Sequence, residues 1–171
     1  MKLLKTITHP DFPTPGIEIV ERFAARIVLV DEDGMVPLVY ASHNFVYQIP
    51  GGWVDEWEDI IDTVHREAIE EVGCKIEILW EIWKIVDERP ATVCKFGVNL
   101  VQTSYCYYGR VISKAKTSFT DTELEQWFEL VWIPVEKVLE KMKQTKARIP
   151  KAEIEAKRDM YIFEEYLKLY L

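Results

Sequence analysis

The chain has 171 residues, of which 49% are hydrophobic and 29% are charged, and its formal net charge is −8 at pH 7. This length and composition predict one soluble domain, residues 1–171, with a single core, and they exclude a disordered or fibrous protein. The acidic balance excludes duplex nucleic acid and an anionic membrane as partners, because both are bound mainly through an excess of Lys and Arg.

The cysteines and the absence of a predicted targeting segment indicate the cellular compartment of the protein. The N-terminal residues contain no long apolar stretch of the kind found in a secretory signal, and no apolar run approaches the length of a membrane span. The cysteines Cys74, Cys94 and Cys106 are too widely spaced for a CxxC metal site or a disulfide framework, so we expect reduced thiols. These features predict a cytoplasmic protein.

Residues 1–22 are rich in proline and are predicted to form a turn-rich lead-in to the core. A continuous apolar run at residues 23–30 then predicts a buried strand. The DEDG sequence at 31–34 predicts a turn, so residues 36–41 are expected to return as the hairpin partner of that strand. A short strand at 46–49 follows.

A helix is predicted from Asp59 to Glu71, where the spacing of apolar residues changes to three and four. Asp59 is a favourable N-cap, and Gly73 can take the left-handed conformation that commonly ends a helix. Apolar residues share one face of this helix, which is expected to pack on the core: Ile61, Val64, Ala68 and Val72.

Two long strands are predicted after this helix, at residues 74–86 and 95–112, because both segments are dense in β-branched and aromatic residues. A last strand is predicted at 128–133, followed by a helix with Pro134 in its first turn. The C-terminal helix is predicted at residues 152–170. Strands with one inserted helix, then strands and helices, predict an α/β fold with a mixed β-sheet covered on both faces.

The predicted C-terminal helix carries apolar side chains over a broad face, including Phe163 and Tyr166. Such a face must be covered. Either it packs on the sheet of its own chain, or part of it forms the interface of a homodimer, which is slightly favoured.

Three glutamates crowd one stripe of the first predicted helix, because Glu67, Glu70 and Glu71 fall within about 100 degrees of arc. Like charges at these spacings destabilise a helix unless a cation neutralises them. Arg66 projects away from Glu67, and one guanidinium cannot satisfy three carboxylates. An all-oxygen site of this kind suits Mg²⁺ or Mn²⁺, and Mg²⁺ usually completes its shell with water and substrate phosphates. The stripe therefore indicates phosphate chemistry.

The same stretch resembles the Nudix box, in which a glycine, five residues, a glutamate and seven residues precede Arg-Glu-apolar-any-Glu-Glu-any-Gly-apolar. Every fixed position is filled in this chain, by Gly52, Glu58, Arg66, Glu67, Glu70, Glu71 and Gly73. Such a set of matches arises by chance on the order of once in 10⁵ sequences, judged from average residue usage. The chain is therefore identified as a member of the Nudix superfamily, similar to a bacterial subgroup whose substrates are mostly unassigned.

The resemblance implies a Nudix-type α/β/α sandwich in which the helix presents its carboxylates to metal ions. Glu67 and Glu71 would be direct metal ligands, and Glu70 would bind the metal directly or through water. Glu58 would support the same cluster, and the carbonyl of Gly51 would complete the shell.

The catalytic base is not fixed by the motif. It is either a box glutamate or an acid from a distant loop, and the loop SFTDTELEQ offers Asp121, Glu123 and Glu125, of which we favour Glu123. A merely solvated surface explains this acidic loop equally well. Arg66 would orient a box glutamate rather than touch substrate.

Trp57 occupies a position where many family members carry glycine, and a tryptophan there is strained if the loop needs a positive φ. Candidate substrate-binding residues are Gly52 and Arg89, the latter for a terminal phosphate. Four aromatic residues either stack on a nucleobase or pack in the core, which is favoured: Trp80, Trp83, Tyr40 and Tyr47.

The expected function is that of a metal-dependent hydrolase that cleaves the diphosphate linkage of a nucleoside diphosphate joined to another moiety. Nucleoside triphosphates and ADP-ribose-type compounds are the leading classes of small-molecule substrate. The alternative is a catalytically silent Nudix-fold module that binds nucleotides or regulates another protein. The complete box favours the enzyme.

Overall fold

A computed structural model of the chain describes residues 1–125 and 127–170. Its elements in chain order are β1 (Leu3–Thr8), β2 (Ile19–Val30), β3 (Met35–Ala41), β4 (Val46–Gln48), α1 (Ile60–Val72), β5 (Cys74–Arg89), β6 (Asn99–Lys114), α2 (Asp121–Glu125), β7 (Phe128–Pro134), the 3₁₀ turn η1 (Val135–Lys137), α3 (Val138–Gln144) and α4 (Pro150–Tyr170). Among the described residues, no helix combines the length and apolar character that a membrane crossing requires.

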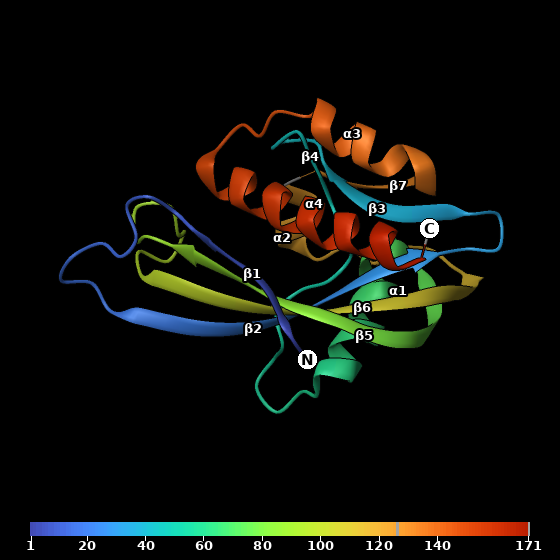
Figure 1. Ribbon diagram of the computed structural model, residues 1–171, viewed down its shortest axis with the longest axis horizontal. Coiled ribbons are helices and arrows are strands. Elements are labelled where there is room, and N and C mark those ends of the chain that lie inside the picture. The colour runs from blue at the N-terminus through green and yellow to red at the C-terminus, as the bar shows by residue number, and fades with distance from the viewer. Residues whose placement is uncertain (126, 171) are drawn as a thin grey trace.

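Two sheets form the centre of the fold (Figure 1). The larger sheet has the strand order β1-β5-β6-β2 and is mixed: β5 and β6 are antiparallel, whereas β1 runs parallel to β5 and β2 runs parallel to β6. The smaller sheet is antiparallel, with the order β4-β3-β7. The mixed sheet predicted from the sequence is confirmed.

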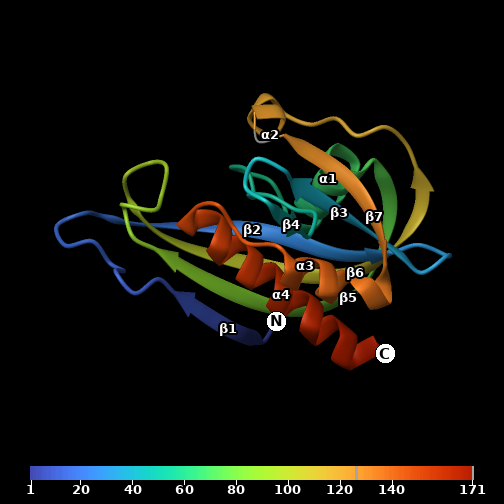
Figure 2. The same ribbon diagram turned by 90° about the horizontal axis from the view of Figure 1, so that it is seen from above.

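Helices cover the larger sheet on opposite sides, α1 on one and α4 on the other (Figure 2). On β2, Ala25, Ile27 and Leu29 pack with the apolar face of α1. The intervening Val28 belongs to a cluster that also contains apolar residues of α3 and of the C-terminal half of α4. A strand buried on both faces is expected to be apolar along its length, and residues 24–29 of β2 are buried and apolar except for Arg26. The order helix, sheet, helix confirms the predicted α/β/α sandwich.

Helix α1 begins and ends where its capping residues predict. The side chain of Asp59 accepts a hydrogen bond from the N–H of Ile61 at 2.8 Å. Gly73 ends the helix at φ 63°, and its N–H donates to the carbonyl of Ile69 at 3.1 Å. One core assignment on this helix is wrong: Ile61 is 38% exposed, and the neighbouring Ile60 packs against the core instead.

The predicted hairpin between the first two core strands is wrong, because β2 and β3 belong to different sheets. The turn at Gly34 forms as predicted, with φ 75°. However, the edge of β2 where a hairpin partner would pair is taken by the segment that follows β4. There the N–H of Ala25 donates to the carbonyl of Gly52, and the N–H of Ile27 donates to that of Pro50, both at 3.0 Å. This pairing holds the glycine-bearing segment against β2.

Two segments predicted to be irregular contain regular structure. Residues 1–22 hold β1, which pairs with β5, and β2 already begins at Ile19. The polar loop before the last strand contains α2. Helix α4 lies where the sequence predicts it, and Ile162, Phe163 and Tyr166 are buried in the core of their own chain. A homodimer interface on the rest of this apolar face stays a prediction.

Candidate active site

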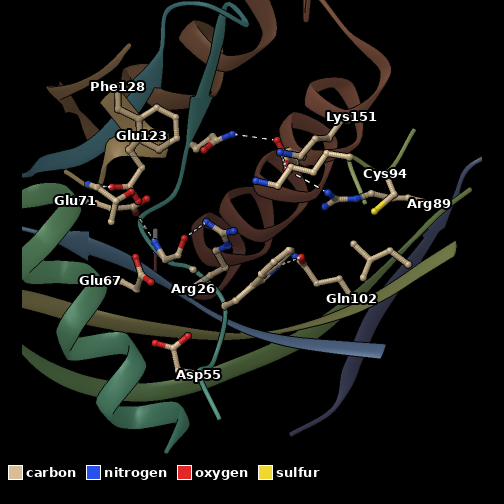
Figure 3. A pocket seen from close by; sticks show the side chains of 18 of the residues that line it. Arg26, Asp55, Glu67, Glu71, Arg89, Cys94, Gln102, Glu123, Phe128 and Lys151 are labelled. Atoms are coloured by element: carbon tan, nitrogen blue, oxygen red, sulfur yellow. Dashed lines mark hydrogen bonds and ion pairs between the residues drawn. The ribbon is translucent and has the colours of Figure 1, made fainter. Parts of the chain in front are cut away.

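Three carboxylates meet at the wall of a cavity of about 390 Å³ (Figure 3). Glu67 and Glu71 of α1 and Glu123 of α2 each place one carboxylate oxygen within 4.8 Å of the others. We call these residues the acidic group. Glu67 and Glu71 are buried, at 5% and 4% exposure, whereas Glu123 is partly exposed. Such a set of oxygen donors suits a hard divalent cation.

Glu123 reaches the helix because the segment between β6 and α2 lies against the last turn of α1. The N–H of Ser118 donates to the carbonyl of Glu70 at 2.7 Å. The carboxylate of Glu123 then accepts a hydrogen bond from the N–H of Thr120 at 2.6 Å, which is the capping arrangement of a threonine and a glutamate three residues apart. The acid that the sequence analysis favoured in this loop thus lies in the acidic group.

Burial raises the pKa of both buried members of the acidic group. For Glu71 the pKa lies well above its usual range, because burial and then the charge of Glu67 both favour the neutral form, while Arg26 opposes them. Burial likewise raises the pKa of Glu67, against the opposing charge of Arg66. A divalent cation would relieve both the desolvation and the mutual repulsion of these carboxylates.

A pair of glycines lets the segment after β4 lie directly against the acidic group. The N–H of Gly51 donates to Oε2 of Glu71 at 2.8 Å. A Cβ on Gly52 would lie 2.1 Å from Oε1 of Glu67, so only glycine leaves room for that carboxylate. The carbonyl of Gly51, predicted to complete a metal shell, accepts a hydrogen bond from Arg26. Gly52, predicted to bind substrate, lies on the cavity wall and makes space for Glu67.

Arg66 connects the box residues that lie beside the acidic group. Its guanidinium donates to Glu67 at 2.7 Å, to Glu58 at 2.8 Å and to Glu70 at 3.2 Å. Arg66 therefore contacts Glu67, contrary to the expectation that it projects away from it. Of the three glutamates in the stripe it pairs with Glu67 and Glu70, and among the described residues no pairing with Glu71 is found. The hydrogen bonds from Arg66 lower the pKa of Glu58 to about 2. Glu58 and Glu70 thus hold Arg66, which in turn holds Glu67.

Trp57 lies in the loop before α1 at φ 70°, in the left-handed region that favours glycine. Its side chain is 97% exposed, so little packing offsets the strain. We expect Trp57→Gly to raise the free energy of unfolding by about 1 kcal/mol in urea titrations, because glycine adopts this φ without strain. The control Trp57→Ala removes the indole but keeps the strained backbone, and equal stability of the two variants would contradict the prediction.

Comparison with known proteins decides the family. A family model described as NUDIX domain matches residues 20–153. The chain belongs to the Nudix family. A solved NUDIX hydrolase from Nitrosomonas europaea has a similar fold, with a TM-score of 0.58 at 17% sequence identity over 87% of this chain and 90% of that chain. The family expected from the box residues is confirmed.

A curated relative of this Nudix chain is the CMP-5'-(N-acetyl-N-hydroxy-3-aminopropyl)phosphonate hydrolase of Streptomyces rubellomurinus, which is 39% identical over 79 residues. That match covers 40% of this chain and 38% of the relative. The chain therefore matches well under half of that hydrolase's length.

Arg89, predicted to bind a terminal phosphate, belongs to an ionic network elsewhere on the cavity wall. It is 3% exposed, and it donates to Asp87 at 2.6 Å and to Glu155 at 3.2 Å. Glu155 also pairs with Lys151 at 3.4 Å, and the Lys151 side chain is 29% exposed. Arg89 thus positions Glu155, and Lys151 is the more accessible of the two cations.

An aromatic wall that the sequence analysis missed lines the same cavity. The rings of Trp53 and Phe96 have centroids 5.6 Å apart, and the indole N–H of Trp53 donates to Gln102 at 2.7 Å. The aromatic residues considered from the sequence are not among the described residues of the cavity wall: Trp80, Trp83, Tyr40 and Tyr47. One indication in the sequence that Trp53 lies near the site is that this residue directly follows the glycine pair.

Proposed function

We propose that this Nudix protein is a divalent-metal-dependent hydrolase that cleaves the diphosphate linkage of a nucleoside diphosphate joined to another group. The acidic group carries the proposal: three carboxylate oxygens from two helices lie within 4.8 Å of one another on the wall of a cavity. Oxygen donors in this arrangement fit Mg²⁺ or Mn²⁺. Family membership supports hydrolysis of this general kind.

Each residue of the site has a part in this proposal. Glu67 and Glu71 would hold the metal, which when bound neutralises charge on phosphorus oxygens and lowers the pKa of a bound water. Glu123, the least buried member of the acidic group, takes the proton of the attacking water. Glu70 would contribute to the metal site through a water molecule, and Glu58 supports the cluster through Arg66. The Gly51 carbonyl has a second lone pair with which to approach the metal.

The cavity wall supports a nucleotide as the substrate. Trp53 and Phe96 offer aromatic faces on which a base can stack, and Lys151 offers a cation for a phosphate or sugar substituent. The relative from Streptomyces is itself named for a CMP-linked phosphonate. Nucleoside triphosphates and ADP-ribose-type compounds both meet this description.

The test is release of phosphate or nucleoside monophosphate from a panel of nucleotides and nucleotide sugars with Mg²⁺, with Mn²⁺ and with EDTA. We expect turnover with either metal and none with EDTA, together with a higher melting temperature in Mg²⁺, because the metal binds only the folded chain. Nucleotide binding without any turnover would replace the hydrolase by a silent nucleotide-binding module. Turnover that persists in EDTA would remove the metal from the proposal.

A further inference from the structure

Arg26 is a charged residue within the apolar run of β2, and its side chain lines the cavity (Figure 3). It is only 9% exposed. In Figure 3 it lies between the acidic group on one side and Arg89 and Lys151 on the other. A guanidinium buried at such a place destabilises the fold unless its N–H groups find partners.

Only some of the N–H groups of the Arg26 guanidinium form hydrogen bonds within the described residues. Nη1 donates to the carbonyl of Ile49 at 3.2 Å and to that of Gly51. Nε is buried without a hydrogen-bond partner, and within residues 1–125 and 127–170 no hydrogen bond or ion pair of Nη2 is found either. One edge of the guanidinium, formed by Nε and Nη2, is thus unused.

Arg26 differs from the other arginines of the cavity wall in its lack of an ion pair, although Nη2 of Arg89 is also buried without a hydrogen-bond partner. Arg66 forms ion pairs with Glu58 and Glu67, and Arg89 forms ion pairs with carboxylates on β5 and α4. In the part of the chain that the structure describes, Arg26 is the arginine of this wall without a carboxylate at ion-pair distance. The missing counter-ion is therefore expected to come from the ligand.

We propose that Arg26 forms a phosphoryl-binding subsite, in which Nε and Nη2 donate to non-bridging oxygens of the substrate's diphosphate group. This inference rests on the proposed function, because it places the diphosphate between the acidic group and Arg26. A planar guanidinium edge donates two parallel hydrogen bonds to a phosphate, which a lysine ammonium cannot reproduce. The ligand class is an organic or inorganic diphosphate, and Arg26 is a substrate-binding residue that also holds the backbone of residues 49–51.

The experiment measures binding of methylenediphosphonate, a diphosphate that cannot be hydrolysed, to the full chain with saturating Mg²⁺ by calorimetry. Arg26→Gln is expected to weaken binding roughly 10- to 100-fold, the effect of losing charge-assisted hydrogen bonds. Affinity for Mn²⁺ alone, measured by electron paramagnetic resonance, should stay at the wild-type value. Arg110→Gln is the matched control, because it removes an exposed guanidinium of β6 that pairs with Glu77 outside the cavity.

Two outcomes would overturn the subsite. One is unchanged methylenediphosphonate affinity in Arg26→Gln; the other is a parallel loss of Mn²⁺ affinity and melting temperature, which shows that Arg26 only supports the backbone. If Arg26→Gln fails to fold, Arg26→Lys is measured in its place. A lysine keeps the positive charge but cannot donate two parallel hydrogen bonds, so this variant is expected to bind methylenediphosphonate roughly 10-fold more weakly than the wild type. Turnover by the wild-type protein tests the hydrolase separately. If the wild type is active but Arg26→Gln binds methylenediphosphonate as tightly as the wild type, only the subsite is refuted. If binding depends on Arg26 but the wild type shows no turnover, only the hydrolase is refuted.

Discussion

Replacing Glu71 by glutamine is expected to lower kcat/KM roughly 10³-fold without unfolding the protein, which corresponds to about 4 kcal/mol of transition-state stabilisation. Glutamine keeps the shape of the side chain and can still accept the hydrogen bond that Gly51 donates at 2.8 Å. It loses the charge that holds a metal. Because the repulsion with Glu67 also disappears, the melting temperature without metal should not fall below that of the wild type.

Kinetics and melting curves together test this variant. The wild-type melting temperature should rise with Mg²⁺ and that of Glu71→Gln should not, since the metal stabilises only a chain that binds it. Asp62→Asn is the control, because it neutralises an exposed carboxylate on the same helix outside the acidic group. Wild-type rates in Glu71→Gln would remove the acidic group from the mechanism.

The features predicted correctly from the sequence are those encoded by nearby residues. Helix α1 needs only its N-cap Asp59, its apolar spacing and Gly73, and all of these lie within one short stretch. The relation between Glu67 and Glu71 follows from that helix, because residues four apart share a face. This local part of the site and the family assignment could be read directly from the box.

The pairing of strands could not be predicted from residues that are close together in the sequence. Leu3 pairs with Lys84, far along the chain, so no nearby residue shows that the segment 3–8 is a strand. The false hairpin has the same origin, since the turn at Gly34 forms but its second strand pairs with β7 instead. A turn signal fixes the chain reversal and not the partner strand.

Long-range contacts also decide which residues complete the site. The sequence offered three acids in the loop before the last strand, and only the fold brings Glu123 to α1. Arg26 and Trp53 were missed because the sequence around a strand or loop residue does not show whether its side chain lines a cavity. One signal for Arg26 was present: a lone charge inside the apolar run FAARIVLV requires a specific partner.

Gly51 and Gly52, the adjacent glycines of the segment after β4, should respond to the same substitution in different ways. An alanine Cβ at Gly51 would lie 2.0 Å from the backbone carbonyl oxygen of Ala25, and φ is +145°, so the backbone itself must move. At Gly52 the Cβ meets Oε1 of Glu67 at 2.1 Å, which is the far end of a flexible side chain. We therefore expect Gly51→Ala to destabilise the fold by about 3 kcal/mol or more, and Gly52→Ala to leave it largely intact.

Gly52→Ala should instead lower catalytic activity. Glu67 can escape the new methyl group only by leaving its place beside Glu71 and Glu123, and a displacement of about 1 Å in a catalytic group can lower activity roughly 10²-fold. Steady-state kinetics, Mn²⁺ titrations and urea unfolding of both variants separate the two effects. Wild-type activity and metal affinity in Gly52→Ala would show that the position of Glu67 does not matter, because that side chain must move in this variant.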